Sequence, residues 1–370
     1  MKTKPTQPTS DWIGRLRVAN QRILGSSFKS PQEAVRFMLA MQGQDFPGVK
    51  WSIGLRVAGS TLAQVEAAFN KGQIVRSWPM RGTLHVTAAE DLPWMLDLHG
   101  KRIIDGMAGR RAQLGLDDKS HGRAQDLAIR GLNGGKALGR AEIFSLFEKG
   151  GVSTKGQRGY HLLAHLSISG VLCLGPLKGK EQAFVLLEEW IKKPRRLDRD
   201  EALGELTRRY FTSHGPATLG DLSGWAKLTV KDTKTGFALA KKSLVELKVD
   251  SKTYYMAPDS EAVLAKAWKG QKTHVAALPG FDEYLLGYKD REAVLEKKHF
   301  EKVVPGSNGM FMSTIVIDGK VVGTWHRKAG SKATVIETRP FRKLSKSDLQ
   351  GFATAVSAWG KFVGTPTRPA

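Results

Sequence analysis

The sequence predicts an α+β protein with three successive winged helix-turn-helix units and a C-terminal β-rich region. A pattern of two or three short helices followed by a β-hairpin occurs three times along the 370 residues. From about residue 272, closely spaced strands and one long closing helix replace this pattern. The composition, with 41% hydrophobic and 25% charged residues, is typical of a globular protein with a sizeable core. The predicted parts are residues 11–100, 101–187, 188–271 and 272–370.

The first unit begins with two helices whose starts carry capping signals. Residues 30–33 (Ser-Pro-Gln-Glu) supply an N-cap, a proline at the first helical position and the glutamate of a capping box. A second box at residues 61–64 opens a helix with one apolar face. Ile74–Trp78 and Thr83–Thr87 alternate around a glycine-containing turn, so they predict the hairpin of this unit.

The second unit repeats this order. An apolar stripe predicts a helix that ends at a pair of glycines, and Ser153 or Thr154 is expected to cap the next helix. Val171–Leu174 and Ala183–Leu187 predict the hairpin. Cys173, the one cysteine of the chain, lies in the first of these apolar runs, so we expect a buried and unreactive thiol.

The third unit follows a basic linker at residues 188–199. Its helices are expected to start near Asp200, Thr218 and Thr229, and its hairpin strands are Leu244–Val249 and Thr253–Met256. In the β-rich region the expected strands and closing helix are Val275–Leu278, Met310–Ile317, Lys320–Trp325, Ala333–Glu337 and Ser345–Phe362. The first ten residues and residues 364–370 are expected to be loose.

The charge balance indicates a polyanionic partner. Fifty-eight Lys and Arg against 35 Asp and Glu give a net charge of +23, and both halves of the chain share the excess. A single cysteine excludes a disulfide framework and a zinc site built on several cysteines. No signal peptide and no apolar run of about 18 residues occur, so we expect a cytoplasmic protein without membrane contact. The sequence has no phosphate-binding loop, no HExxH and no GxSxG, and its histidines show no metal spacing, so no cofactor or metal is expected.

Two sets of residues in the second unit are candidates for binding DNA. Arg158, His161 and His165 are three and four residues apart, so they share the helix face opposite the leucines, and Lys155 precedes them. Lys178 and Lys180 stand in the loop of the hairpin, where a wing contacts phosphates. The alternative for the helix is an ordinary solvated polar face.

The segment Met41-Gln42-Gly43-Gln44-Asp45 is the main candidate for chemistry. The apolar stripe of the preceding helix predicts an apolar residue at 42, and an inward-facing amide there needs partners or costs roughly 1–3 kcal/mol. If the chain turns at Gly43, Gln42 and Gln44 can converge, hold a water and offer carbonyl dipoles to a positive centre, while Asp45 can act as a base. The alternative is a helix cap followed by a surface residue.

Two further segments are accessory candidates. Arg81 and His85 stand at the first hairpin turn, where the alternative is simply a turn with an exposed arginine. Asp282 belongs to the run Leu278–Tyr284, in which two adjacent acids follow Pro-Gly. That run is a turn, a helix start or a site.

Five segments together resemble the bacterial winged-helix DNA glycosylase family that includes AlkZ and YcaQ. They are MQGQDFPGVKWSIGLR (41–56), VRSWPMRGTLHVTAAEDL (75–92), RYFTSHGPATLGDLSGWAKL (209–228), LPGFDEYLLGYKDR (278–291) and DGKVVGTWHR (318–327). The AlkZ-like branch has a Gln-x-Gln motif, which falls on Gln42 and Gln44, whereas the YcaQ-like branch has Asp in place of the second Gln. Between them stands Gly43, where the family more often has a larger apolar residue.

This resemblance implies three tandem winged-helix units around DNA and a monofunctional glycosylase. Its substrates would be bulky N7-alkylated purines, including interstrand crosslinks, in double-stranded DNA. Gln42 and Gln44 would be catalytic, and the protein would act as a monomer. The alternatives are a non-enzymatic winged-helix regulator, which the lack of a dimerisation helix disfavours, and an RNA-binding module, for which no aromatic RNP-like strand is present.

Overall fold

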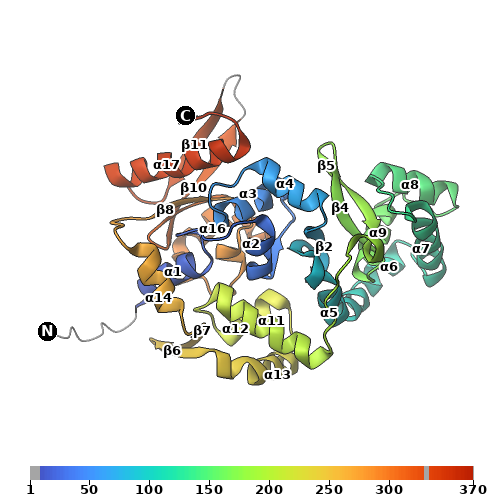
Figure 1. Cartoon of the computed structure of the whole chain (residues 1–370), viewed down its shortest axis with the longest axis horizontal. Helices are drawn as coiled ribbons and strands as arrows, with labels where there is room; N and C mark the ends of the chain where they lie inside the picture. Colours follow the sequence, from blue (N-terminus) through green and yellow to red (C-terminus); the bar gives the residue numbers. More distant parts are fainter. Residues whose placement is uncertain (1–8, 329–332, 370) are drawn as a thin grey trace. The chain divides into compact units, whose positions relative to one another are not determined.

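Helices and several small sheets give the chain an α+β fold in the computed structural model, which describes residues 9–328 and 333–369 (Figure 1). The described residues form two compact units. One contains the chain up to Val65 and again from Leu203, and the other is Glu66–Ala202. Within the described ranges no helix is long and apolar enough to cross a membrane. The four parts predicted from the sequence were drawn from its motifs and not from compactness. That division stays a prediction.

The first unit opens with α1 (Ser10–Asn20), α2 (Pro31–Met38), β1 (Ala40–Gln42) and α3 (Phe46–Arg56). The predicted capping serine is confirmed, because the Ser30 hydroxyl accepts a hydrogen bond from the Glu33 N–H at 3.2 Å. The expectation that this helix reaches residue 42 is wrong. It ends at Met38, because Leu39 turns the backbone to a φ of 69° and the next three residues form a strand.

The third predicted motif lies mainly in this unit. The structure contains its three helices, its hairpin and one helix that the sequence analysis did not predict: α11 (Arg199–His214), α12 (Leu219–Ala226), α13 (Val230–Ala240), β6 (Val245–Val249), β7 (Lys252–Met256) and α14 (Ser260–Trp268). Both predicted caps are confirmed. Thr218 exchanges the two hydrogen bonds of a capping box with Asp221, at 2.9 and 3.1 Å. The hydroxyl of Thr229 accepts from the Asp232 N–H at 3.0 Å.

A five-stranded sheet with the order β12-β11-β10-β9-β8 forms the C-terminal part of this unit. The elements from residue 275 are β8 (Val275–Leu278), α15 (Glu283–Leu286), α16 (Phe300–Val303), β9 (Thr314–Ile317), β10 (Lys320–Lys328), β11 (Thr334–Pro340), α17 (Lys346–Val363) and β12 (Thr367–Pro369). The four predicted strands and the closing helix are present, although β9 is shorter than expected. The tail is not loose throughout, because Thr367–Pro369 pairs in parallel with β11. A buried core under the sheet includes Leu278, Tyr284 and Val316.

The second unit contains a sheet that joins the first two predicted hairpins. Strands β3, β2, β4 and β5 follow one another, and β2 contacts β4 through the pair Arg76 and Leu174. The elements are α4 (Leu62–Asn70), which begins in the first unit, β2 (Ile74–Met80), β3 (Thr83–Ala88), α5 (Leu92–Gly106), α6 (Ala108–Gln113), α7 (Asp118–Leu132), α8 (Arg140–Lys149), α9 (Arg158–Ile168), β4 (Leu172–Lys178), β5 (Glu181–Leu186) and α10 (Leu187–Trp190). Cys173 is fully buried in this unit, as expected.

One capping prediction in this unit is wrong. Ser153 and Thr154 do not start α9, which begins four residues later at Arg158 after a left-handed Gln157. Thr154 instead donates its backbone N–H and its hydroxyl to Glu148, at 2.6 and 2.7 Å. The polar residues that resembled an N-cap therefore close the end of the preceding helix.

His274, beside β8, gives the first unit a defined pH dependence. Burial lowers the pKa of its imidazole from 6.5 to about 4, and the Asp318 carboxylate opposes this only in part. The His274 imidazole therefore takes up a proton near pH 6.5 in the unfolded chain, but only near pH 4 in the folded chain. Because the unfolded state holds more protons in this window, stability falls as the pH drops through it.

We expect His274 to cost up to about 2 kcal/mol of unfolding free energy between pH 7 and pH 5. Urea unfolding of wild type and His274→Gln at both pH values measures this. The variant should lose less stability on acidification than wild type does. An identical loss in both proteins would contradict the assignment.

Candidate functional site

The two candidate glutamines lie in the short segment between β1 and α3. Gln42 is the last residue of β1 and is 8% exposed, whereas Gln44 is exposed to solvent. Asp45 stands at the N-cap position of α3, and its carboxylate lies against Gly48 so closely that a Cβ there would be 2.3 Å from Oδ2. The chain leaves β1 after Gln42 and bends at Gln44 and Asp45 before α3 begins. The convergence of the two amides stays a prediction.

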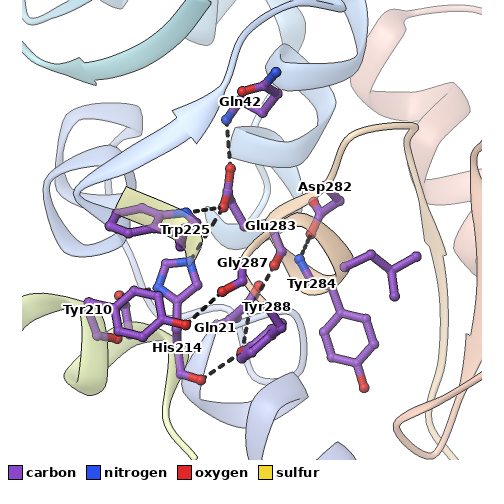
Figure 2. A network of polar contacts seen from close by, with 12 residues as sticks. Gln21, Gln42, Tyr210, His214, Trp225, Asp282, Glu283, Tyr284, Gly287 and Tyr288 are labelled. Carbon is purple, nitrogen blue, oxygen red and sulfur yellow. Dashed lines mark hydrogen bonds and ion pairs between the residues drawn. The ribbon is translucent and has the colours of Figure 1, made fainter. Parts of the chain in front are cut away.

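A buried carboxylate holds the backbone of Gln42. The Gln42 N–H donates to Glu283 Oε1 at 2.7 Å, and the Trp225 indole N–H donates to Oε2 at 2.9 Å (Figure 2). His214 Nε2 lies 3.6 Å from the same Oε2, just beyond hydrogen-bond distance. Glu283, Trp225 and His214 are each at most 1% exposed. The position of Gln42 therefore depends on residues far from it in the sequence.

Asp282 belongs to a neighbouring ion pair. Its two oxygens accept from the two terminal nitrogens of Arg56, each at 3.0 Å, and the Ser52 hydroxyl also donates to it. It further caps α15 by accepting from the Tyr284 N–H at 2.9 Å. Since these bonds engage both oxygens in a buried place, the geometry favours a structural role, in which Asp282 fixes α3 to the start of α15.

A second layer of hydrogen bonds surrounds this pair. Gln21 accepts from Arg56 at 2.9 Å. It also donates to the Tyr288 hydroxyl at 2.9 Å (Figure 2). That hydroxyl in turn donates to the carbonyl of His214 at 2.7 Å. The ring of Tyr210 stacks on His214 with 4.8 Å between centroids. Burial lowers the pKa of His214, and the Glu283 carboxylate only partly opposes this, so its imidazole is neutral at pH 7.

Arg81 and His85 lie together in the second unit, at the turn between β2 and β3. Arg81 Nη2 is 2.7 Å from His85 Nε2, and His85 Nδ1 is 2.8 Å from the carbonyl of Thr83. Because the carbonyl can only accept, Nδ1 carries the proton and Nε2 accepts from the guanidinium, which describes a neutral imidazole. His85 is fully buried and Arg81 is partly buried. The arginine is therefore held in place rather than exposed at a simple turn.

The six candidate DNA-binding residues, also in the second unit, differ in how they are held. Lys155, Lys178 and Lys180 are exposed, and Lys178 pairs with Glu142 at 2.6 Å. Arg158 donates to the carbonyls of Ser153, Leu114 and Gly115, which hold its guanidinium against the protein.

The two histidines of α9 are partly buried. Burial first, and then the nearby His121 and Arg111, lower the pKa of His165 to about 4, and burial also lowers the pKa of His161. The His165 ring lies 4.0 Å from that of His121, between centroids. Both histidines of α9 are therefore neutral at pH 7, and the exposed positive charge of this set comes mainly from its lysines.

From the sequence, Glu283 was noted only as one of two adjacent acids, and Asp282 was the one selected as a candidate. Trp225 was expected on the apolar face of a helix, and neither it nor His214 was given a role in a site. The available signal was a glutamate followed at once by Tyr-Leu-Leu, since a carboxylate inside an apolar run needs partners. Within the described residues, no three His, Cys, Asp or Glu side chains gather closely enough to hold a metal ion.

Comparison with known proteins connects this arrangement to one family. Residues 35–362 match the family model described as DNA glycosylase AlkZ-like. The chain is similar to the interstrand DNA cross-link repair glycosylase of Streptomyces sahachiroi, with 25% identity over 310 residues, which cover 80% of this chain and 82% of the relative. Its structure resembles that of the Streptomyces sahachiroi DNA glycosylase AlkZ with a TM-score of 0.80 and 21% identity, over 99% and 100% of the two chains. This last likeness shows the fold.

Proposed function

Because the chain belongs to the AlkZ-like DNA glycosylase family, we propose that it hydrolyses the N-glycosidic bond of bulky N7-alkylated purines in double-stranded DNA and unhooks interstrand crosslinks. One observation supports this most directly. The two glutamines of the Gln-x-Gln motif lie between the end of β1 and the start of α3, and a buried carboxylate holds the backbone N–H of the first. A crosslink repair activity is named for the relative in Streptomyces sahachiroi.

The proposed mechanism follows from charge. Alkylation at N7 makes the purine cationic, so the base leaves with little acid catalysis, and the transition state has oxocarbenium character at the sugar, as in glycoside hydrolysis. The carbonyl dipoles of Gln42 and Gln44 orient a water and stabilise this positive charge. Asp45 assists as a base, and Arg81, which the buried His85 holds in place, contacts the DNA backbone. No lysine nucleophile takes part, so the strand is not cut.

We further propose that the three hairpins are the wings of three tandem winged-helix units. The supporting observations are the helices that precede each of β2–β3, β4–β5 and β6–β7. The protein is proposed to act as a monomer and in the cytoplasm, where bacterial DNA is repaired. An open cleft suits a bulky or crosslinked base better than a tight flipping pocket.

Lys180 is expected to contact a DNA phosphate. It is exposed beside Gly179 at the turn between β4 and β5. Binding releases roughly 0.9 counterions for each neutralised phosphate, so Lys180→Ala should reduce the slope of log affinity against log salt by about 1. Fluorescence anisotropy with a plain duplex between 50 and 200 mM salt measures the slope. Lys266→Ala, an exposed lysine of α14, serves as the control, and an unchanged slope in Lys180→Ala would remove this residue from the interface.

The proposed function is tested by base release from two duplexes. One carries N7-methylguanine and the other a nitrogen-mustard-type crosslink. We expect wild type to release base from the first and to unhook the second, without cutting either strand. Tight, sequence-tolerant DNA binding with no release from either duplex would contradict the proposal and favour the non-enzymatic DNA-binding alternative.

A further inference from the structure

We propose that Glu283 is a positioning residue of the glycosylase reaction, because its buried carboxylate fixes the peptide of Gln42 and thereby sets where the Gln42 amide meets the sugar. This inference rests on the proposed function. Glu283 is 1% exposed, so its effect on the reaction passes through the residues that it holds.

Both oxygens of the Glu283 carboxylate accept hydrogen bonds. Each oxygen accepts one N–H from a different part of the chain, Oε1 from Gln42 in β1 and Oε2 from Trp225 in α12 (Figure 2). The lengths of 2.7 and 2.9 Å are those of charge-assisted hydrogen bonds, which are stronger than neutral ones. The Gln42 N–H and the Trp225 indole N–H each need an acceptor here. A carboxylate supplies two acceptor oxygens in one side chain.

Glu283 is itself held by contacts on several sides. Its backbone lies in the first turn of α15, next to Asp282, which is held by the buried Arg56. Its carbonyl accepts from Gln21 at 3.3 Å. The indole of Trp225 packs against both Tyr210 and His214, with ring centroids 5.0 and 5.2 Å away. The carboxylate is thus held from both sides, and through its hydrogen bond it fixes the backbone N–H of Gln42.

Burying the Glu283 carboxylate has an energetic cost. A buried carboxylate loses its hydration, which costs several kcal/mol before its partners offset the loss. Packing alone would be served as well by an apolar side chain of similar size. The fixed peptide of Gln42 instead supplies the precision that a dipole needs, since a displacement of about 1 Å at a reacting centre can cost roughly 100-fold in rate.

The test uses four variants of the full chain. In Glu283→Gln the carboxamide has one acceptor for two donors, so its NH₂ must face either Trp225 or Gln42. In Trp225→Phe/Glu283→Gln the indole donor is gone, and the carbonyl can again accept from Gln42. Trp225→Phe alone is the reference for the double variant. Glu261→Gln, on the exposed surface of α14, is the matched control for loss of a carboxylate.

Single-turnover release of N7-methylguanine gives the rate, and titration of the enzyme gives the half-saturating concentration. We expect Glu283→Gln to slow release about 10- to 100-fold, with less than about a twofold change in half-saturation. The double variant should regain most of that loss and approach Trp225→Phe. A purely structural role would not produce recovery by a second buried substitution.

Three results would overturn the inference while the proposed function stands. They are a wild-type rate in Glu283→Gln, a loss expressed only as weaker binding, or a double variant as slow as Glu283→Gln. If Glu283→Gln does not fold, Trp225→Phe/Glu283→Gln is compared with Trp225→Phe/Glu283→Leu, and equal rates overturn the inference. A wild type that releases no base from any substrate instead overturns the proposed function.

Discussion

Replacing Gln42 or Gln44 by alanine is expected to lower the single-turnover rate of base release by about 10²–10³-fold, the usual effect of removing one preorganised dipole from a developing charge. Duplex binding should change little, because the lysines proposed to contact phosphates are elsewhere in the sequence. Glutamate at either position should recover part of the rate, since a carboxylate also offers an oxygen to the water and to the cation. Release of N7-methylguanine under excess enzyme measures each rate.

Gln32→Ala, a glutamine substitution on α2 away from the motif, is the matched control and should leave the rate near that of wild type. Both motif variants must retain the thermal unfolding and DNA affinity of wild type. If base release persists in both, the glycosylase activity stands and the catalytic assignment fails. Asp45→Asn would then test whether the carboxylate at the start of α3 activates the water.

Removing Arg56 is expected to cause the largest loss of stability. Its guanidinium is fully buried and pairs with both oxygens of Asp282, which is itself 3% exposed. Arg56→Met leaves a buried carboxylate without its cation, and this typically costs about 3–5 kcal/mol. Urea unfolding should show the loss in the first unit, and Arg56→Met/Asp282→Leu should lose less than the sum of the two single variants.

The matched control is an ion pair on the surface of the same unit. Lys297 and Glu292 are 2.6 Å apart, but the lysine is 86% exposed. Water screens such a pair, so Lys297→Met should change the unfolding free energy by only about 0–1 kcal/mol. Equal losses in Arg56→Met and Lys297→Met would show that the buried pair is no more stabilising than the exposed one.

The sequence predicted best those features that depend on neighbours along the chain. The caps at Ser30, Thr218 and Thr229 and all three hairpins were placed correctly, because capping and turn formation involve residues within a few positions. The end of α2 was not predicted, because Leu39 has a positive φ and leucine rarely adopts one. Eight helices were not predicted either: α1, α3, α5, α6, α7, α10, α14 and α16.

Features that join distant segments could not be predicted. The contact between β2 and β4 merges two hairpins that looked like separate wings, and no local pattern encodes it. Glu283 is 241 residues from Gln42 in the chain, so only the folded structure reveals that it holds the candidate site. The Gln-x-Gln motif could be recognised through the resemblance to a known family. The hydrogen bond from Gln42 to Glu283 could not.

The burial of Cys173 should protect this protein from the alkylating agents that damage DNA. The agents that alkylate guanine at N7 are electrophiles, and in proteins they react fastest with thiolates. The one thiol of this chain is fully buried, and burial raises its pKa far above neutrality, so almost no thiolate exists to react. A nitrogen mustard that damages DNA should therefore not alkylate Cys173. Base release can then continue while the damaging agent is still present.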